Sequence, residues 1–130
     1  MKILLIDDDV MLRRTVARVL QSAGHDVTTA QDGLDGMRMF HKTRPDLVIT
    51  DIYMPRQEGF ETILALRREN PSLGIIAISG GSMTGSREML DIAGNIGANS
   101  ILEKPFTMAE LLDCVRAFAS PAAAAEDPAD

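Results

Sequence analysis

Short apolar segments alternate with longer amphipathic segments along most of the chain. Consecutive apolar residues occur at residues 3–6, 47–49, 75–78 and 101–102, and a weaker candidate lies at residues 26–30. Segments of this length that are rich in Ile and Val are typical of strands buried in a parallel sheet. Their starts are 21 to 28 residues apart, which leaves room for one helix between each strand and the next.

Apolar residues recur at helical spacing after each of these segments, so a helix is predicted to follow every strand. Gly24 is predicted to end the first helix, and Asp32 is a predicted N-cap of the second. Thr107 and Glu110 form a capping box at the start of the last helix. The residues that mark the five helices by this spacing are Leu12, Val16, Val19 or Leu20, and Ala23; Leu34, Met37 and Phe40; Phe60, Ile63, Leu64 and Arg67; Met89, Ile92, Ala93 and Ile96; and Leu111, Leu112, Val115 and Phe118.

This alternation of strand and helix predicts an α/β fold. We expect a doubly wound, five-stranded parallel sheet of the order (βα)5, with helices on both faces. The chain has 130 residues, which is the length of a single domain. That domain is predicted over residues 1–119. Residues 120–130 carry no apolar stripe and are predicted to form a flexible C-terminal tail or the stub of a linker.

Charge and composition argue against several classes of function. Asp and Glu total 19 and Lys and Arg total 13, which gives a formal net charge of −6 and argues against direct binding of nucleic acid. No apolar segment approaches the about 20 residues of a membrane span, so we expect no membrane insertion. Cys114 is the single cysteine, which excludes an internal disulfide. A cytoplasmic protein is expected.

Polar residues follow four of the predicted strands. Asp7, Asp8 and Asp9 follow the first strand, Asp51 the third, Ser79 the fourth and Lys104 the fifth. Because ligands of open parallel sheets bind at the carboxyl ends of the strands, these side chains are expected to meet at one edge. Each alone has an ordinary explanation as a helix cap, a turn or a surface loop. Their arrival at one edge favours a functional site.

Several carboxylates in one crevice need a compensating cation. Mg²⁺ is the expected cofactor, because it prefers a few carboxylate oxygens together with phosphate oxygens and water. A lysine beside such a cluster adds a second positive charge, which is suited to phosphoryl transfer. An aspartate such as Asp51 can itself act as the nucleophile and form an acyl phosphate.

These motifs together resemble the receiver domain of two-component response regulators, over about residues 1–119. Leu5-Ile6-Asp7-Asp8-Asp9 resembles the acidic pair of the family. The segment from Leu47 to Pro55, followed by Glu58-Gly59, resembles the phosphoacceptor loop. Ile78-Ser79 resembles the strand that ends in a switch Ser or Thr, and Lys104-Pro105-Phe106 resembles the Lys-Pro-Phe signature. The resemblance implies a flavodoxin-like receiver fold.

The resemblance also implies a metal site and a phosphoacceptor. Asp51 is implied to accept a phosphoryl group from the phosphohistidine of a histidine kinase or a histidine phosphotransfer protein. Asp8 and Asp51 are implied to bind Mg²⁺ directly, with Asp7 acting mainly through water. The backbone carbonyl of Tyr53 is implied to complete the protein ligands, and Lys104 to pair with the acceptor and then with the phosphoryl oxygens.

Further roles follow from the same resemblance. Ile52 and Gly80 are implied to contact the phosphoryl group, and Ser79 to act as the switch hydroxyl. The peptide bond before Pro105 is implied to be cis. Ile101 stands where the family has a switch aromatic residue, so we expect the signal to run through the loop after the fourth strand and the helix that follows it. Such a protein is expected to be no enzyme beyond assisting its own phosphorylation and dephosphorylation.

Other functions stay open at this point. The chain is either a stand-alone switch, a phosphorylation-independent interaction module, or the receiver fragment of a larger regulator with an output domain beyond residue 130. A phosphate-ester hydrolase is less favoured, because Tyr53 stands where a haloacid-dehalogenase-type enzyme has a second Asp. The downstream protein target is unknown, and a monomer or a phosphorylation-dependent dimer is expected. Arg13, Arg14 and Arg18 form either a solvated helix face or a docking surface for an acidic partner.

Overall fold

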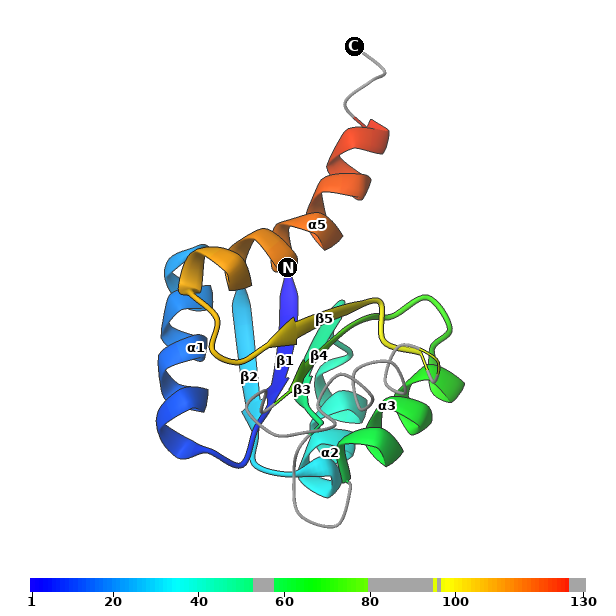
Figure 1. Cartoon of the computed structure of the whole chain (residues 1–130). Helices are drawn as coiled ribbons and strands as arrows, with labels where there is room; N and C mark the ends of the chain where they lie inside the picture. Colours follow the sequence, from blue (N-terminus) through cyan, green and yellow to red (C-terminus); the bar gives the residue numbers. More distant parts are fainter. Residues whose placement is uncertain (53–57, 80–94, 96, 127–130) are drawn as a thin grey trace.

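The structure is a computed structural model of the chain that describes residues 1–52, 58–79, 95 and 97–126. Its centre is a five-stranded sheet in which every neighbouring pair of strands is parallel, in the order β2-β1-β3-β4-β5 (Figure 1). This order confirms the predicted doubly wound α/β fold. The strands are β1 (Lys2–Ile6), β2 (Asp26–Ala30), β3 (Leu47–Asp51), β4 (Gly74–Ser79) and β5 (Ser100–Glu103).

Helices cover both faces of the sheet because the strand side chains alternate between two apolar cores. Ile3 and Leu5 of β1 belong to the core shared with α1 (Val10–Ser22) and α5 (Met108–Glu126). Leu4 and Ile6 belong to the opposite core, shared with α2 (Gly33–Thr43) and α3 (Glu58–Glu69). Because both faces of the sheet are buried in this way, the carboxyl ends of the strands are the expected place for a site.

The predicted helix boundaries are confirmed by their hydrogen bonds. The Asp32 side chain accepts a hydrogen bond from the backbone N–H of Asp35 at 2.7 Å, at the start of α2. Gly24 follows α1 with a φ of 96°, a left-handed conformation that glycine adopts without steric cost. At the start of α5, the Glu110 carboxylate accepts from the backbone N–H of Thr107 at 2.8 Å, and the Thr107 hydroxyl accepts from that of Glu110 at 3.0 Å.

Replacing Thr107 with alanine is expected to lower the free energy of unfolding by about 1 kcal/mol, because the backbone N–H of Glu110 loses its acceptor. Thr107→Ser keeps the hydroxyl and is expected to restore most of the loss. Urea denaturation of the two variants and the parent protein measures both effects. A serine variant as unstable as the alanine variant would show that the hydroxyl contributes nothing.

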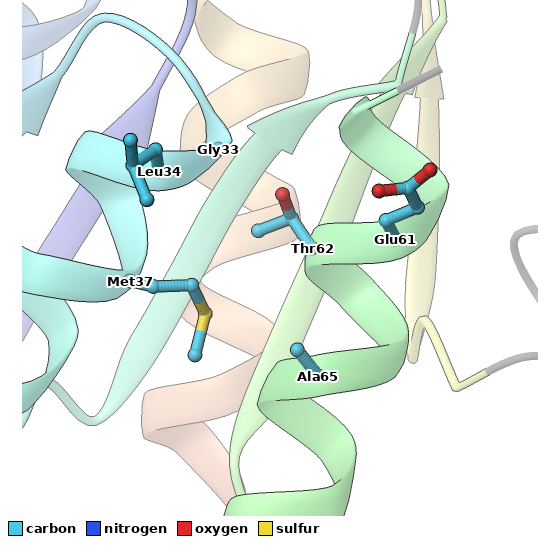
Figure 2. A pocket seen from close by; sticks show the side chains of 6 residues that line it. All are labelled: Gly33, Leu34, Met37, Glu61, Thr62 and Ala65. Carbon is cyan, nitrogen blue, oxygen red and sulfur yellow. The ribbon is translucent and has the colours of Figure 1, made fainter. Parts of the chain in front are cut away.

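Leu34, which belongs to the predicted apolar stripe of the second helix, does not pack into the core. Its side chain is 84% exposed and lines a hollow of about 370 Å³ between α2 and α3, with Met37 on the same helix and Thr62 and Ala65 facing it from α3 (Figure 2). Leu34 is only the second residue of its helix, where α3 does not reach across to cover it. The rest of the α2 stripe does face the core, through Phe40 and the partly buried Met37.

Two other expectations concern the second half of the chain. The helix predicted around Met89 to Ile96 lies almost wholly outside the described residues. Residues 120–126, predicted as the start of a flexible tail, are helical and extend α5 to Glu126. Residues 127–130 lie outside the described part of the chain, and the assignment of the segment after residue 119 as a linker stub stays a prediction. No helix among the described residues is long and apolar enough to cross a membrane.

Candidate functional site

The predicted site residues of four strands meet at the carboxyl edge of the sheet. Asp7 and Asp8 follow β1, Asp51 is the last residue of β3, Ser79 is the last residue of β4, and Lys104 follows β5. Parallel pairing places Asp51 beside Ile78 and Ser79 beside Glu103. The strands therefore end at nearly the same level, which is why residues so distant in sequence can form one site.

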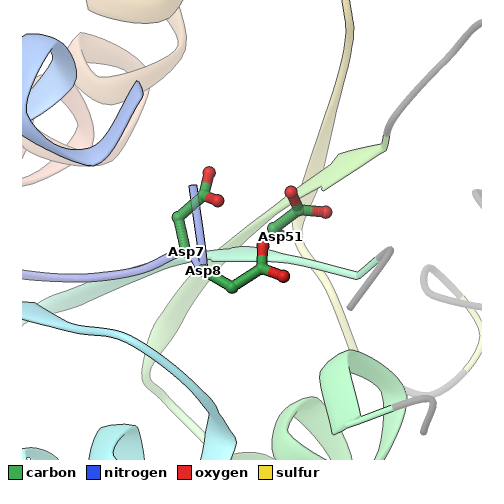
Figure 3. Close-up of side chains that lie close together, drawn as sticks. All are labelled: Asp7, Asp8 and Asp51. Carbon is green, nitrogen blue, oxygen red and sulfur yellow. The ribbon is translucent and has the colours of Figure 1, made fainter. Parts of the chain in front are cut away.

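Three carboxylates define the centre of this site. One oxygen from each of Asp7, Asp8 and Asp51 lies within 4.8 Å of the others, and Figure 3 shows the three side chains gathered at the ends of β1 and β3. Asp7 is 1% and Asp51 3% exposed, whereas Asp8 is exposed to solvent. Two buried carboxylates this close repel each other unless a cation or a proton is shared between them.

Asp7 shows this electrostatic cost most clearly. Its pKa is raised to about 6, chiefly by burial. The backbone hydrogen bond from Asp9 opposes this rise, and the negative charge of Asp51 contributes to it. Asp7 Oδ1 accepts that hydrogen bond at 2.8 Å. Asp7 Oδ2 is buried and accepts no hydrogen bond from any residue that the structure describes. This oxygen is therefore available to a ligand that carries positive charge or donates a hydrogen bond.

Lys104 supplies the basic group of the site. Its ammonium donates a hydrogen bond to Asp51 Oδ2 at 3.1 Å. Its backbone N–H donates to the carbonyl of Ser79 at 3.0 Å, which ties the end of β5 to the end of β4. The Lys104–Pro105 peptide bond is cis, as the sequence resemblance implies. Asp51 therefore has two carboxylates and one ammonium close to its own carboxylate.

The donor set fits a hard divalent cation. Carboxylate oxygens are the ligands that Mg²⁺ prefers, and an open site leaves room for the waters that it retains. The buried, unpaired Asp7 Oδ2 and the three oxygens within 4.8 Å are the features that support this fit. Asp7, Asp8 and Asp51 are the described residues that could hold such an ion.

The remaining predicted site residues are placed in different ways. Tyr53 and Gly80 lie outside the described residues, so their implied contacts stay predictions. The backbone N–H of Ile52 donates to the carbonyl of Ile78 at 2.8 Å. The side chain of Ser79 is buried at 1% exposure, whereas Ile101 is 37% exposed on β5. The hydroxyl that the resemblance implies as the switch thus lies inside the molecule, and an aliphatic side chain lies at the surface of β5.

Two supporting contacts were not predicted from the sequence. The Arg13 guanidinium donates a hydrogen bond to the backbone carbonyl of Asp7 at 2.7 Å. Gly59 lies so close to the end of β3 that a Cβ built on it lies 2.3 Å from Ile52 Cα and 2.7 Å from the Asp51 carbonyl oxygen. The glycine of the Glu58-Gly59 pair was visible in the sequence, but nothing local indicated what it approaches.

Comparison with known proteins identifies the class to which this fold and site belong. The family description "Response regulator receiver domain" matches residues 3–116. The chain belongs to this family.

Several relatives are similar over most of this chain. A response regulator named MprA from Mycobacterium leprae is 36% identical over 118 residues, which cover 90% of this chain and 50% of the relative. A receiver domain protein from Clostridium thermocellum has a TM-score of 0.84 at 28% identity, covering 92% of this chain and 94% of that protein. The chemotaxis response regulator CheY4 of Vibrio cholerae has a TM-score of 0.80 at 31% identity, covering 90% of this chain and 97% of that protein. The chain spans about half the length of the curated relatives it matches.

Proposed function

We propose that this chain is a phosphoryl-accepting receiver of a two-component phosphorelay, in which Asp51 is phosphorylated. The observation that supports this most is the convergence of the Asp7, Asp8 and Asp51 carboxylates with the Lys104 ammonium, 3.1 Å from Asp51 Oδ2. The phosphodonor is the phosphohistidine of a histidine kinase or a histidine phosphotransfer protein. The reaction takes place in the cytoplasm and switches a surface that binds a further protein.

In the proposed reaction, an Asp51 oxygen attacks phosphorus, the phosphorus–nitrogen bond of the donor breaks, and the electron pair returns to the histidine ring. Bound Mg²⁺ supplies positive charge that neutralises the phosphoryl oxygens. Lys104, already paired with Asp51, transfers its hydrogen bond to one of these oxygens. The hydroxyl of Ser79, at the end of the neighbouring strand, donates a hydrogen bond to another phosphoryl oxygen. The protein assists its own phosphorylation and dephosphorylation and is not proposed to turn over a separate substrate.

Phosphorylation by a small donor tests this proposal directly. The protein is incubated with Mg²⁺ and acetyl phosphate, and its intact mass is measured. A gain of one phosphoryl group is expected in the parent protein and in Asp26→Asn, which alters an exposed carboxylate on β2. Asp51→Asn is expected to show no gain. An unmodified parent protein, or equal modification of Asp51→Asn, contradicts the proposal and favours a phosphorylation-independent interaction module.

Mg²⁺ is expected to stabilise the folded protein, because a ligand that binds only the folded state shifts the unfolding equilibrium. At ten times its dissociation constant it raises the free energy of unfolding by about 1.4 kcal/mol. Thermal unfolding with and without Mg²⁺ measures the effect, and Asp8→Asn is expected to lose most of it. A rise in the melting temperature of Asp8→Asn equal to that of the parent would place the metal elsewhere.

A second candidate is that the chain acts as the receiver part of a larger regulator. It is favoured by the observation that the curated relatives are about twice as long as the aligned region. The phosphoryl chemistry is the same in both cases, but the output differs. Sequencing the reading frame past Asp130 distinguishes them, because a following DNA-binding or enzymatic domain is expected only for the second candidate.

A further inference from the structure

A second hollow lies beside α1. It has a volume of about 440 Å³ and runs between α1 and the edge strand β2. Its floor is Ala17 of α1, and its walls are formed by Arg13, Arg14, Arg18 and Gln21 of the same helix and by Thr29 of β2.

Helix geometry explains why the hollow exists. Residues 13, 14 and 21 are the neighbours of Ala17 on the helix surface at positions i−4, i−3 and i+4. Arg18 follows Ala17 directly in the sequence and also lines the hollow. Ala17 is buried, with 8% exposure, so a short methyl group is surrounded by four long polar side chains. Three of these four carry a guanidinium, and Thr29 adds a hydroxyl from the neighbouring strand.

The positive charge of this hollow is not neutralised within the described part of the protein. None of the ion pairs found there includes Arg13, Arg14 or Arg18. The charge of Arg13 acts weakly on Asp35, whose pKa lies below its ordinary value chiefly through the hydrogen bond from Arg38 and only to a smaller extent through Arg13. The chain as a whole has a net charge of −6, but the positive charge of the hollow attracts anions to this part of its surface.

One of the three arginines is already held in place. Arg13 donates to the carbonyl of Asp7 at 2.7 Å, so part of its side-chain freedom is lost before any ligand arrives, which reduces the entropic cost of binding. Arg14 and Arg18 lie one helical turn apart and face the same way. Guanidinium groups bind phosphate through paired hydrogen bonds, so two arginines at this spacing can engage different phosphate groups of one ligand.

We propose that the hollow between α1 and β2 binds a small ligand that carries linked phosphate groups, such as a nucleoside di- or triphosphate. Its volume lies in the range of small-molecule sites. Its lining offers three guanidiniums, an amide and a hydroxyl, and its floor is a single methyl group. A protein partner needs a larger apolar or aromatic centre than this, and a nucleic acid needs a longer basic surface.

Titration with inorganic tripolyphosphate in metal-free buffer tests the proposal without relying on phosphorylation of Asp51. Calorimetry is expected to show saturable binding that weakens with salt, and amide NMR shifts are expected at Ala17 and Thr29. The double variant Arg14→Gln/Arg18→Gln is expected to lose at least about tenfold in affinity. The matched control Arg68→Gln/Arg116→Gln removes the same charge from α3 and α5 and is expected to bind normally.

Two further titrations identify the ligand chemistry. ATP is expected to bind at the same residues at least as tightly as tripolyphosphate, whereas a hexaglutamate peptide is expected to bind far more weakly. The proposal is overturned if tripolyphosphate shows no saturable binding. It is also overturned if the control variant loses as much affinity as the Arg14→Gln/Arg18→Gln variant. It is equally overturned if hexaglutamate binds as well as ATP with the same shifts, because the surface then selects acidic polypeptide rather than phosphate.

Discussion

Replacing Asp7 with asparagine is expected to raise the free energy of unfolding of the metal-free protein by about 1–3 kcal/mol near neutral pH. Asp7 is 1% exposed, and burial raises its pKa to about 6 from an ordinary value of 3.8. A tenfold change in proton affinity corresponds to about 1.4 kcal/mol, so keeping this side chain charged costs up to about 3 kcal/mol. The asparagine amide still leaves a buried donor to satisfy, which lowers the expected gain.

The difference in stability between the parent protein and Asp7→Asn is expected to depend on pH. Because the folded protein binds the proton of Asp7 more tightly than the unfolded chain does, the contribution of Asp7 to stability is fully present below about pH 4. It is lost as the pH rises through about 6. The parent protein should therefore become less stable than Asp7→Asn across this interval, while the two converge at lower pH.

Urea denaturation in the presence of a chelator, repeated between pH 4 and pH 8, measures the difference. Asp26→Asn serves as the control, because Asp26 is an exposed residue on the edge strand and should show almost no difference at any pH. A pH-independent gain in Asp7→Asn, or a loss of stability near neutral pH, would rule out the cost of burying the Asp7 charge as the cause. Adding Mg²⁺ is expected to reduce the difference in the free energy of unfolding between Asp7→Asn and the parent protein, because Mg²⁺ stabilises the parent protein.

The fold could be predicted from the sequence because its signals are local and repeated. β2 was predicted over the residues where the structure has it, and the other strands differ by one or two residues at their ends. Buried residues fill both faces of β1, β3 and β4, so each of these strands contains a short continuous apolar segment. The caps at Asp32 and Thr107 were equally readable, because a cap depends on residues within one helical turn.

The candidate site followed from the fold by one topological rule. Once the strands are parallel, the residues directly after them must share an edge, and this places Asp7, Asp51 and Lys104 together without further information. The rule does not give distances. That Lys104 contacts Asp51 rather than Asp7 or Asp8 depends on side-chain geometry, which no spacing in the sequence specifies.

What the sequence could not show depends on contacts between distant elements. An apolar residue in the first turn of a helix has helical spacing whether or not a neighbouring helix covers it, so the 84% exposure of Leu34 was not predictable. The extension of α5 past Ala119 has a different cause. Alanine is the strongest helix former, so the run of four alanines is helical without any apolar stripe to indicate it.

Replacing Gly59 with alanine is expected to lower the free energy of unfolding by about 2–3 kcal/mol, because the added methyl group has no space. A Cβ at this position lies 2.3 Å from Ile52 Cα and 2.8 Å from the Ile52 carbonyl carbon. These are backbone atoms, which cannot rotate away as a side chain can. Either α3 must move outward or the end of β3 must bend, and both disturb Asp51.

Gly36→Ala is the matched control, because it makes the same substitution near the start of α2. Its Cβ meets Ile6 Cδ1 at 2.5 Å, which is the flexible end of a side chain, so a smaller loss of stability is expected. Urea denaturation compares the two variants, and Mg²⁺ titration reports on the site. Gly59→Ala should bind Mg²⁺ more weakly than the parent because the Asp51 carboxylate is displaced. Equal losses of stability in the two variants would show that the backbone contact at Gly59 is no tighter than the side-chain contact at Gly36. Unchanged Mg²⁺ binding by Gly59→Ala would show that the approach of α3 to the backbone after β3 does not set the position of Asp51.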